Sequence, residues 1–112
     1  MGYRVELTAR AQGDIGEIFD WIEEAAHDAA VRWYLGLIAK LVTLQALPNR
    51  CSKAPESVVV QREVRQIYYG RRPHWFRALF EIRGDVVFVL RVRRCAQSEI
   101  PKDELFDEDV RQ

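Results

Sequence analysis

The spacing of apolar residues changes once along the chain, and this change limits the folds that the sequence can adopt. From Ala11 to Leu44 the apolar residues recur every three or four positions, which is the period of an amphipathic helix. From Glu63 to Arg94 the period falls to two, which is typical of strands with one buried face. A chain of 112 residues is long enough for one core. The sequence therefore predicts a single domain in which helices precede most of the strands.

The helical part predicts a hairpin of two helices. Thr8 stands at the expected N-cap of the first helix, whose apolar stripe includes Ile15. A second stripe runs over residues 30–44 after a short polar break, and it ends before Pro48. Because the break is so short, the two helices should lie antiparallel. Residues 48–62 contain two prolines and are expected to form a connecting loop.

Four strands complete the prediction. They are expected at residues 3–7, 63–69, 74–83 and 86–94, with turns at residues 70–73 and 84–85. The resulting order is β-α-α-β-β-β. It predicts an α+β domain whose last three strands form an antiparallel sheet, joined by the first strand, with the helical hairpin packed on one face.

The formal net charge of zero hides an uneven distribution. Residues 62–94 hold 9 arginines and 3 acidic residues, a net of +6. Residues 1–61 carry 6 basic and 8 acidic residues, a net of −2, and residues 95–112 carry 2 and 6, a net of −4. Arginine outnumbers lysine by 14 to 3, and planar guanidinium groups suit bidentate contact with phosphate or carboxylate. The block 62–94 is therefore expected to meet a nucleic-acid backbone or an acidic protein surface.

Alternation along the strands predicts which face carries these arginines. Apolar rows are formed by Phe76, Ala78, Phe80 and Ile82, which should face the helices, and by Val86, Phe88, Leu90 and Val92 in the last strand. Arg77, Arg91 and Arg93 should share the opposite, open face. Trp75 belongs to the same row and could stack on a base or anchor a partner. Arg65 is placed with them, although its strand alternates less cleanly.

A second interpretation of the arginines and of the acidic C-terminus stays open. Each arginine could instead pair with a carboxylate, such as Glu63, Glu81 or one in the acidic tail, and only solvate the sheet. Residues 98–112 are predicted as an acidic tail outside a domain of residues 1–97, and their composition favours disorder. The alternative is that Ile100, Leu105 and Phe106 fold back on the basic sheet face or contact a partner.

Several classes of protein are excluded by what the sequence lacks. No apolar run approaches the about 20 residues of a membrane-spanning helix, and residues 1–7 do not read as a secretory signal. Cys51 and Cys95 have no metal-ligand spacing and are expected to be reduced thiols. We therefore expect a soluble cytoplasmic protein without membrane contact, with no metal and no cofactor.

Five segments in a fixed order resemble the RelE/ParE toxin superfamily of type II toxin–antitoxin systems, which includes plasmid stabilization proteins. They are residues 3–8 (YRVELT), 14–22 (DIGEIFDWI), 54–56 (APE), 63–70 (EVRQIYYG) and 89–93 (VLRVR). The resemblance covers residues 3 to about 97. It implies a small α+β toxin that halts growth unless a cognate antitoxin binds it.

The resemblance implies one of two targets. ParE-like members inhibit DNA gyrase without being enzymes, whereas RelE-like members are metal-independent endonucleases that cleave mRNA on the ribosome. In RelE-like nucleases a His or Tyr near the end of the last strand joins the arginines of the open face. Arg94 stands about where many of these relatives have His, and no Tyr, His or Lys follows before Lys102.

The resemblance therefore favours the ParE-like function, and no catalytic residue is assigned. The candidate target-binding or phosphate-binding residues are Arg65, Trp75, Arg77, Arg91, Arg93 and Arg94. A RelE-like endonuclease and a degenerate, non-toxic interaction module stay open as alternatives.

Overall fold

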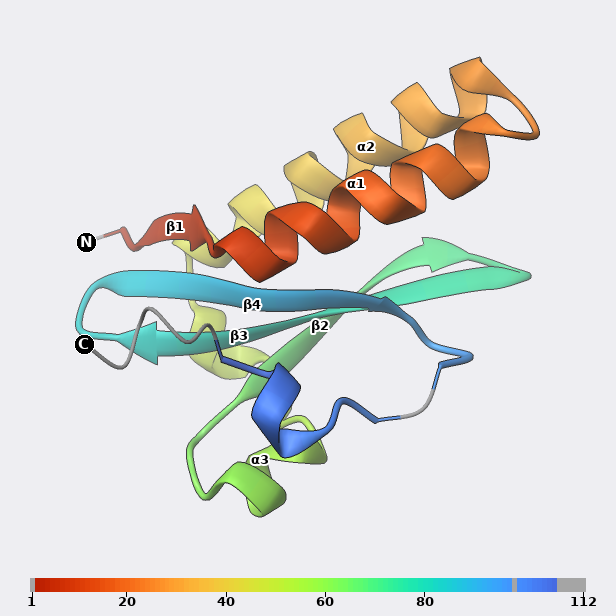
Figure 1. Cartoon of the computed structure of the whole chain (residues 1–112). Helices are drawn as coiled ribbons and strands as arrows, with labels where there is room; N and C mark the ends of the chain where they lie inside the picture. Colours follow the sequence, from red (N-terminus) through yellow and green to blue (C-terminus); the bar gives the residue numbers. More distant parts are fainter. Residues whose placement is uncertain (1, 98, 107–112) are drawn as a thin grey trace.

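A computed structural model describes residues 2–97 and 99–106 and contains the predicted order of helices and strands (Figure 1). Strand β1 spans Arg4–Leu7, and the hairpin consists of α1 (Ala9–Glu23) and α2 (His27–Val42). The remaining strands are β2 (Arg65–Arg71), β3 (His74–Arg83) and β4 (Val86–Arg94). The α+β prediction is confirmed, and strand boundaries deviate by at most two residues. None of the helices formed by the described residues is long and apolar enough to span a bilayer.

Helix α1 begins where the sequence predicts. The Thr8 hydroxyl oxygen accepts a hydrogen bond from the Ala11 N–H at 3.2 Å, which satisfies one of the free donors of the first turn. The same hydroxyl donates to the carbonyl of Leu90 in β4 at 3.0 Å. The cap therefore also fixes the start of α1 against the sheet.

The connection between α2 and β2 contains helical turns that the sequence analysis did not predict. Short 3₁₀ turns occupy Thr43–Gln45 and Pro48–Arg50, and a one-turn helix α3 spans Glu56–Val60. The Ser57 hydroxyl closes this segment by accepting from the Val64 N–H at 3.1 Å. Residues 48–62 do connect α2 to β2, as predicted, but the helical turns within the connection were not foreseen, because elements this short do not produce a detectable period.

The four strands form one sheet in the order β1-β4-β3-β2. Strands β2, β3 and β4 are antiparallel neighbours, as predicted, and β1 pairs with β4 in parallel. β1 is short and reaches along β4 only from Val86 to Val89. The far half of β4 is therefore an edge of the sheet, a point that matters for the position of Arg91 below.

The helical hairpin covers one face of the sheet (Figure 1), and the main core lies between the two layers. Trp33, Leu37 and Leu41 of α2 and Ile15 of α1 pack there against the sheet. The strands contribute the side chains of Ile67, Phe76, Ala78, Phe80, Val87, Val89 and Val92. The apolar row predicted for β3 therefore faces the helices, as expected.

A register shift corrects the predicted apolar row of β4. Leu79 pairs with Arg91 and Phe80 pairs with Val89, so Leu90 has no counterpart in β3. This bulge reverses the alternation at Leu90. Val87, Val89 and Val92 consequently face the helices, whereas Phe88 and Leu90 belong to a second cluster. The prediction that Val86, Phe88, Leu90 and Val92 form a single row is wrong because the bulge is not visible in the alternation.

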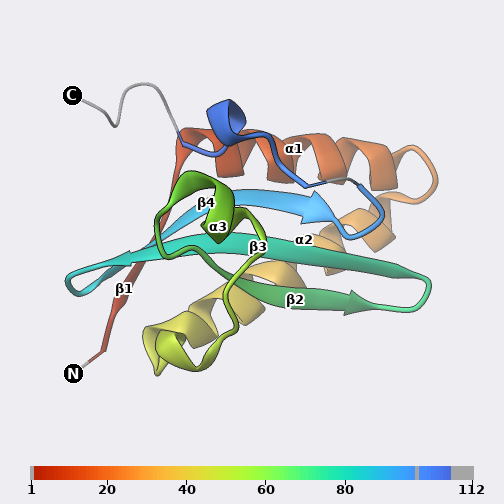
Figure 2. The same ribbon diagram turned by 90° about the horizontal axis from the view of Figure 1, so that it is seen from below.

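The second cluster lies on the other face of the sheet, beneath α3 and the C-terminal segment of residues 99–106 (Figures 1 and 2). Ile100 and Leu105 are 4 % and 1 % exposed and pack with Leu79, Leu90 and other apolar side chains. The expected disorder of the tail is therefore wrong for residues 99–106. The alternative, that this segment folds back on the sheet, describes it correctly. Residues 98 and 107–112 lie outside the described residues.

Candidate functional site

Three of the predicted arginines share one face of the sheet. Arg77 of β3 lies directly across from Arg93 of β4, and Leu79 lies across from Arg91, so all four side chains leave the sheet on the side opposite the helices. The expected grouping of Arg77, Arg91 and Arg93 is thus present. The expectation that this face is open is wrong, because α3 and residues 99–106 cover it.

Arg77 is buried in an ion pair with Glu56 of α3. Its Nη1 and Nη2 donate to the two carboxylate oxygens of Glu56 at 2.9 and 2.5 Å, and Nη1 also donates to Gln66 Oε1 at 3.1 Å. Arg77 and Glu56 are only 7 % and 1 % exposed. The Ile100 N–H donates to the same carboxylate at 3.0 Å. Arg77 therefore joins the sheet, α3 and the C-terminal segment, and it does not face solvent.

Opposing effects act on the pKa of Glu56. Burial raises the pKa of the carboxyl, but hydrogen bonds from Arg77 and from the backbone, including the Ile100 N–H, outweigh it, and the net pKa is lowered. The hydrogen bond from the Arg77 guanidinium to Glu56 likewise raises the pKa of Arg77. Both groups therefore remain charged at neutral pH.

Arg91 is held by Asp14 of α1. Its Nε and Nη2 donate to the two oxygens of Asp14 at 2.7 and 2.9 Å, and Nη1 donates to the carbonyl of Glu104. The Val92 N–H donates to Asp14 Oδ2 at 2.9 Å. Since β1 ends opposite Val89, this edge N–H would otherwise lack a strand partner. Asp14 therefore neutralises Arg91 and also closes the edge of β4.

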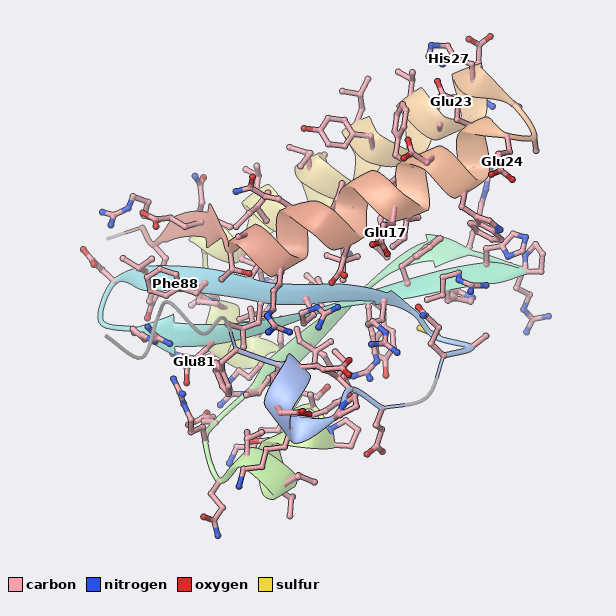
Figure 3. The ribbon with its side chains drawn as sticks, viewed as in Figure 1. Glu17, Glu23, Glu24, His27, Glu81 and Phe88 are labelled. Atoms are coloured by element: carbon pink, nitrogen blue, oxygen red, sulfur yellow. The ribbon has the colours of Figure 1, made fainter. Side chains whose placement is uncertain are left out.

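A groove of about 370 Å³ lies between α1 and the end of β4. Arg93 and Arg94 line it together with Glu17 and Trp21. Glu17 lies on the side of α1 that faces the sheet (Figure 3). The Arg94 guanidinium lies 4.7 Å from the centre of the Trp21 ring, within the range of a cation–π contact. Arg94 pairs with Phe76 across the sheet and therefore belongs to the helix side, away from the row of Arg77.

The other two predicted residues lie elsewhere. Trp75 is 43 % exposed at the start of β3, in the row of Arg77, as expected. Arg65 pairs across the sheet with Phe80, a helix-facing residue, and donates to the carbonyl of Cys51 and to Glu63. The placement of Arg65 on the face of Arg77 is therefore wrong, because the strand register puts it on the opposite side.

Groups that could transfer protons are dispersed over the molecule. Glu81 lies beside Phe88 at the end of the sheet near the β3–β4 turn, whereas His27 and Glu23 lie at the tip of the helical hairpin (Figure 3). Glu81 accepts from Arg62 at 2.8 and 2.7 Å and from Arg83 at 2.7 Å. His74 packs edge-on against Trp21 at 5.8 Å between ring centres. Among the described residues, neither Glu81 nor His74 hydrogen-bonds to Arg77 or Arg91, whose carboxylate partners are Glu56 and Asp14.

The sequence analysis missed the partners of Arg77 and Arg91 and a second arginine cluster. The expected pairing with Glu63 and Glu81 is present for Arg65 and for Arg62 and Arg83. The carboxylates that bind Arg77 and Arg91 instead belong to Glu56 and Asp14, which the sequence analysis did not name as partners. Arg32, Arg71 and Arg72 line another groove, between α2 and the end of the β2–β3 hairpin. Tyr69, Arg71 and Arg72 are close together in the sequence, and this proximity could have indicated a binding surface. Arg32 is too far away along the chain for the sequence to associate it with them. Among residues 2–97 and 99–106, no His, Cys, Asp and Glu side chains cluster as a metal site would require.

Comparison with known proteins identifies the family. A family model described as the ParE toxin of type II toxin–antitoxin systems matches residues 5–99. A solved chain from the chromosomal ParDE toxin–antitoxin system of P. aeruginosa is similar in fold, with a TM-score of 0.66 and 24 % identity over 82 % of this chain and 95 % of that chain. A search of curated proteins finds no match. The chain therefore belongs to the ParE toxin family of type II toxin–antitoxin systems.

Proposed function

We propose that this chain halts growth in the cytoplasm by binding DNA gyrase without catalysing a reaction, and that a cognate antitoxin neutralises it. We favour gyrase over mRNA as the target because the arginines on the sheet face opposite the helices are bound and covered by other parts of the chain. Arg77 and Arg91 are each bound by a carboxylate, and the segment of residues 99–106 packs over this face. Arg77 and Arg91 are therefore not available on this face as an open row of cations for an RNA backbone.

The requirements of RNA cleavage argue in the same direction. Without a metal, cleavage needs a base for the 2′-hydroxyl, an acid for the leaving oxygen and cations for the phosphorane within one site. Glu81 is held by Arg62 and Arg83, and His74 packs on Trp21. Neither is placed to act with Arg77 or Arg91. A protein that acts by binding needs no such cluster.

Three of the candidate residues are retained as proposed contacts with the target. Trp75 is exposed, and Arg93 and Arg94 line the groove beside α1. Aromatic and arginine side chains of this kind are frequent anchors of protein interfaces. Arg65, Arg77 and Arg91 are reassigned to structural roles because their guanidinium groups hold other parts of the chain.

The target can be tested by inducing the chain in cells with and without its antitoxin. We expect growth arrest and an SOS response that the antitoxin suppresses, and inhibition of purified gyrase in a supercoiling assay. Primer extension on translated mRNA should show no new cuts. Cuts in the ribosomal A site with gyrase unaffected would overturn the proposal in favour of the endonuclease. Absence of growth arrest, with folded protein present, would favour the non-toxic interaction module.

Point variants then test the proposed contacts. Trp75→Ala and Arg94→Ala should weaken gyrase inhibition by about tenfold each, the effect of losing about 1.4 kcal/mol at an interface anchor. Arg50→Ala is the control, since Arg50 is exposed in the 3₁₀ turn Pro48–Arg50, outside the lining of the α1–β4 groove. Equal inhibition by all three variants would remove Trp75 and Arg94 from the target surface.

A further inference from the structure

Two aromatic side chains are exposed on the sheet face opposite the helices, close to the turn of the β2–β3 hairpin. Tyr68 of β2 lies across from Arg77, and Trp75 lies two residues before Arg77 in β3, so both rings leave the sheet on the side of Arg77. Tyr68 and Trp75 are 49 % and 43 % exposed. Helix α3 and residues 99–106 cover the middle of this face and leave the hairpin end uncovered (Figures 1 and 2). Both rings are therefore accessible from solvent.

The two rings are diagonal neighbours on adjacent strands. The direct partner of Trp75 in β2 is Gly70, so β2 places no side chain immediately beside the indole. A larger residue is disfavoured at position 70, because the φ of Gly70 is +120° and a Cβ there would lie 2.6 Å from the His74 carbonyl oxygen. Diagonal neighbours in an antiparallel pair lie about 7–8 Å apart. Aromatic rings exposed in this way on neighbouring strands are a common arrangement for stacking successive bases of a single strand.

The strand segments that reach this end of the sheet carry positive charge only. Residues 64–80 contain four arginines and residues 86–97 contain three, and neither segment contains Asp or Glu. Glu81 lies at the other end of the sheet, near the β3–β4 turn (Figure 3). Arg71 and Arg72 are exposed at the hairpin turn and, in the described part of the chain, form no ion pair with a carboxylate. Two unneutralised guanidinium groups beside exposed rings favour a polyanionic partner.

A single strand of nucleic acid fits this combination of groups. Guanidinium groups bind phosphate bidentately, and an aromatic ring stacks on the flat face of any base. In a duplex the bases are already stacked on one another, so only a single strand can use the rings and the arginines together. An acidic protein surface would match the charge but would not require two flat rings at this spacing.

We propose that the hairpin-end surface, formed by Tyr68, Arg71, Arg72 and Trp75, binds single-stranded nucleic acid. Two bases stack on Tyr68 and Trp75, and Arg71 and Arg72 contact the phosphates beside them. The inference concerns binding without cleavage. It goes beyond the proposed function, because it assigns a ligand to the chain in the absence of gyrase. Trp75 is also a proposed contact with the target, and the experiments below separate the two roles.

Stacking is tested by fluorescence anisotropy of a labelled oligothymidine of about 12 nucleotides. Trp75→Ala and Tyr68→Ala should each weaken binding by about tenfold, because each removes one stacked base. Tyr34→Ala is the matched control, since Tyr34 is a tyrosine of similar exposure on α2, and it should bind within about twofold of the unchanged chain. Binding of a duplex of the same length should not change in Trp75→Ala, because its bases are not available to the ring.

The phosphate contacts are tested by salt dependence. A double variant, Arg71→Ala with Arg72→Ala, should weaken binding of the oligothymidine by about tenfold at low salt. Its slope of log K against log salt concentration should be smaller by about 1.4, because each phosphate contact on a single strand contributes about 0.7. The control, Lys40→Ala with Arg50→Ala, removes the same charge from exposed positions on α2 and in the turn Pro48–Arg50. Its slope should equal that of the unchanged chain.

Tryptophan fluorescence gives a readout that a purely electrostatic contact would not move. Saturation with oligothymidine should quench the emission of the unchanged chain, and Trp75→Phe should lose most of this quenching while it still binds. If the unchanged chain does not bind the strand at low salt, or if Trp75→Ala and Tyr68→Ala bind as well as Tyr34→Ala, the inference is overturned. Gyrase inhibition that is still weakened by Trp75→Ala would then assign this surface to a protein contact alone, and the proposed function would stand. If the strand binds as expected and gyrase is not inhibited, the inference stands and the proposed function fails.

Discussion

Arg77 and Glu56 form a bidentate ion pair that is almost completely buried between the sheet and the C-terminal segment. The carboxylate also receives the Ile100 N–H, so one charged pair connects β3, α3 and residues that follow the last strand. A strand arginine that the sequence marks as a candidate for binding phosphate is thus part of the interior. Its energetic role leads to the first prediction.

Removing Glu56 should strongly destabilise the fold. Glu56→Ala leaves the Arg77 guanidinium buried without its carboxylate, and breaking a buried pair in this way costs about 3–5 kcal/mol of unfolding free energy. Urea unfolding followed by circular dichroism measures the loss. Glu63→Ala is the control, because Glu63 is exposed and its ion pair with Arg65 should contribute only about 0–1 kcal/mol. Similar losses in the two variants would contradict the assigned role of Glu56.

The same carboxyl should make stability depend on pH in the acid range. The folded state lowers the pKa of Glu56, so the folded state holds fewer protons there than the unfolded state, in which the pKa is about 4.3. The stabilisation is fully present above about pH 4.3 and is lost as the pH falls through the lower, folded-state pKa. Urea midpoints between pH 7 and pH 3 should therefore fall less steeply for Glu56→Gln than for the unchanged chain. Parallel curves would show that Glu56 does not couple folding to protonation.

Gly36 should be intolerant of alanine although it lies within a helix. A Cβ would lie 2.1 Å from the Tyr69 hydroxyl oxygen and 3.0 Å from the ring carbon that bears it, so Gly36→Ala should cost about 1–3 kcal/mol through overpacking. Tyr69→Phe in the same chain should recover part of this loss, because the closest atom is removed. Gly16→Ala in α1 should instead raise the unfolding free energy by about 0.5–1 kcal/mol, since its Cβ meets nothing within 4 Å. Thermal and urea unfolding of the four proteins checks the set.

The C-terminal segment should behave as part of the core. Leu105 is 1 % exposed and packs with Ile100, Leu79 and Leu90, so Leu105→Ala should cost about 2–5 kcal/mol. Val58→Ala serves as the comparison, because Val58 is 82 % exposed and its loss should change stability by no more than about 0.5 kcal/mol. A stability unaffected by Leu105→Ala would mean that residues 99–106 do not hold the sheet in solution.

The sequence by itself determined the number, type and order of the main elements. The change of period from 3.6 to two reflects how each helix and strand buries one side, which is a local property of consecutive residues. The Thr8 cap and the end of the helical pattern before Pro48 were also predictable, because each depends only on neighbouring residues. The elements that escaped, such as the single turn of α3, are too short to repeat any period.

Sequence alternation also placed Arg77, Arg91 and Arg93 on one face of the sheet. Which residues bind these arginines and which segments cover that face was determined only by the tertiary structure. Asp14 reaches Arg91 from a helix 77 residues away, and Glu56 reaches Arg77 from 21 residues away. The burial of Ile100 and Leu105 could not be predicted from the acidic composition of the C-terminus, because it depends on packing against the sheet face opposite the helices. A local pattern states which side of its own strand a residue occupies, and it contains no information on which distant segment covers that side. Composition and period therefore decided the fold, whereas long-range packing decided which arginines are interior and which remain available to a partner.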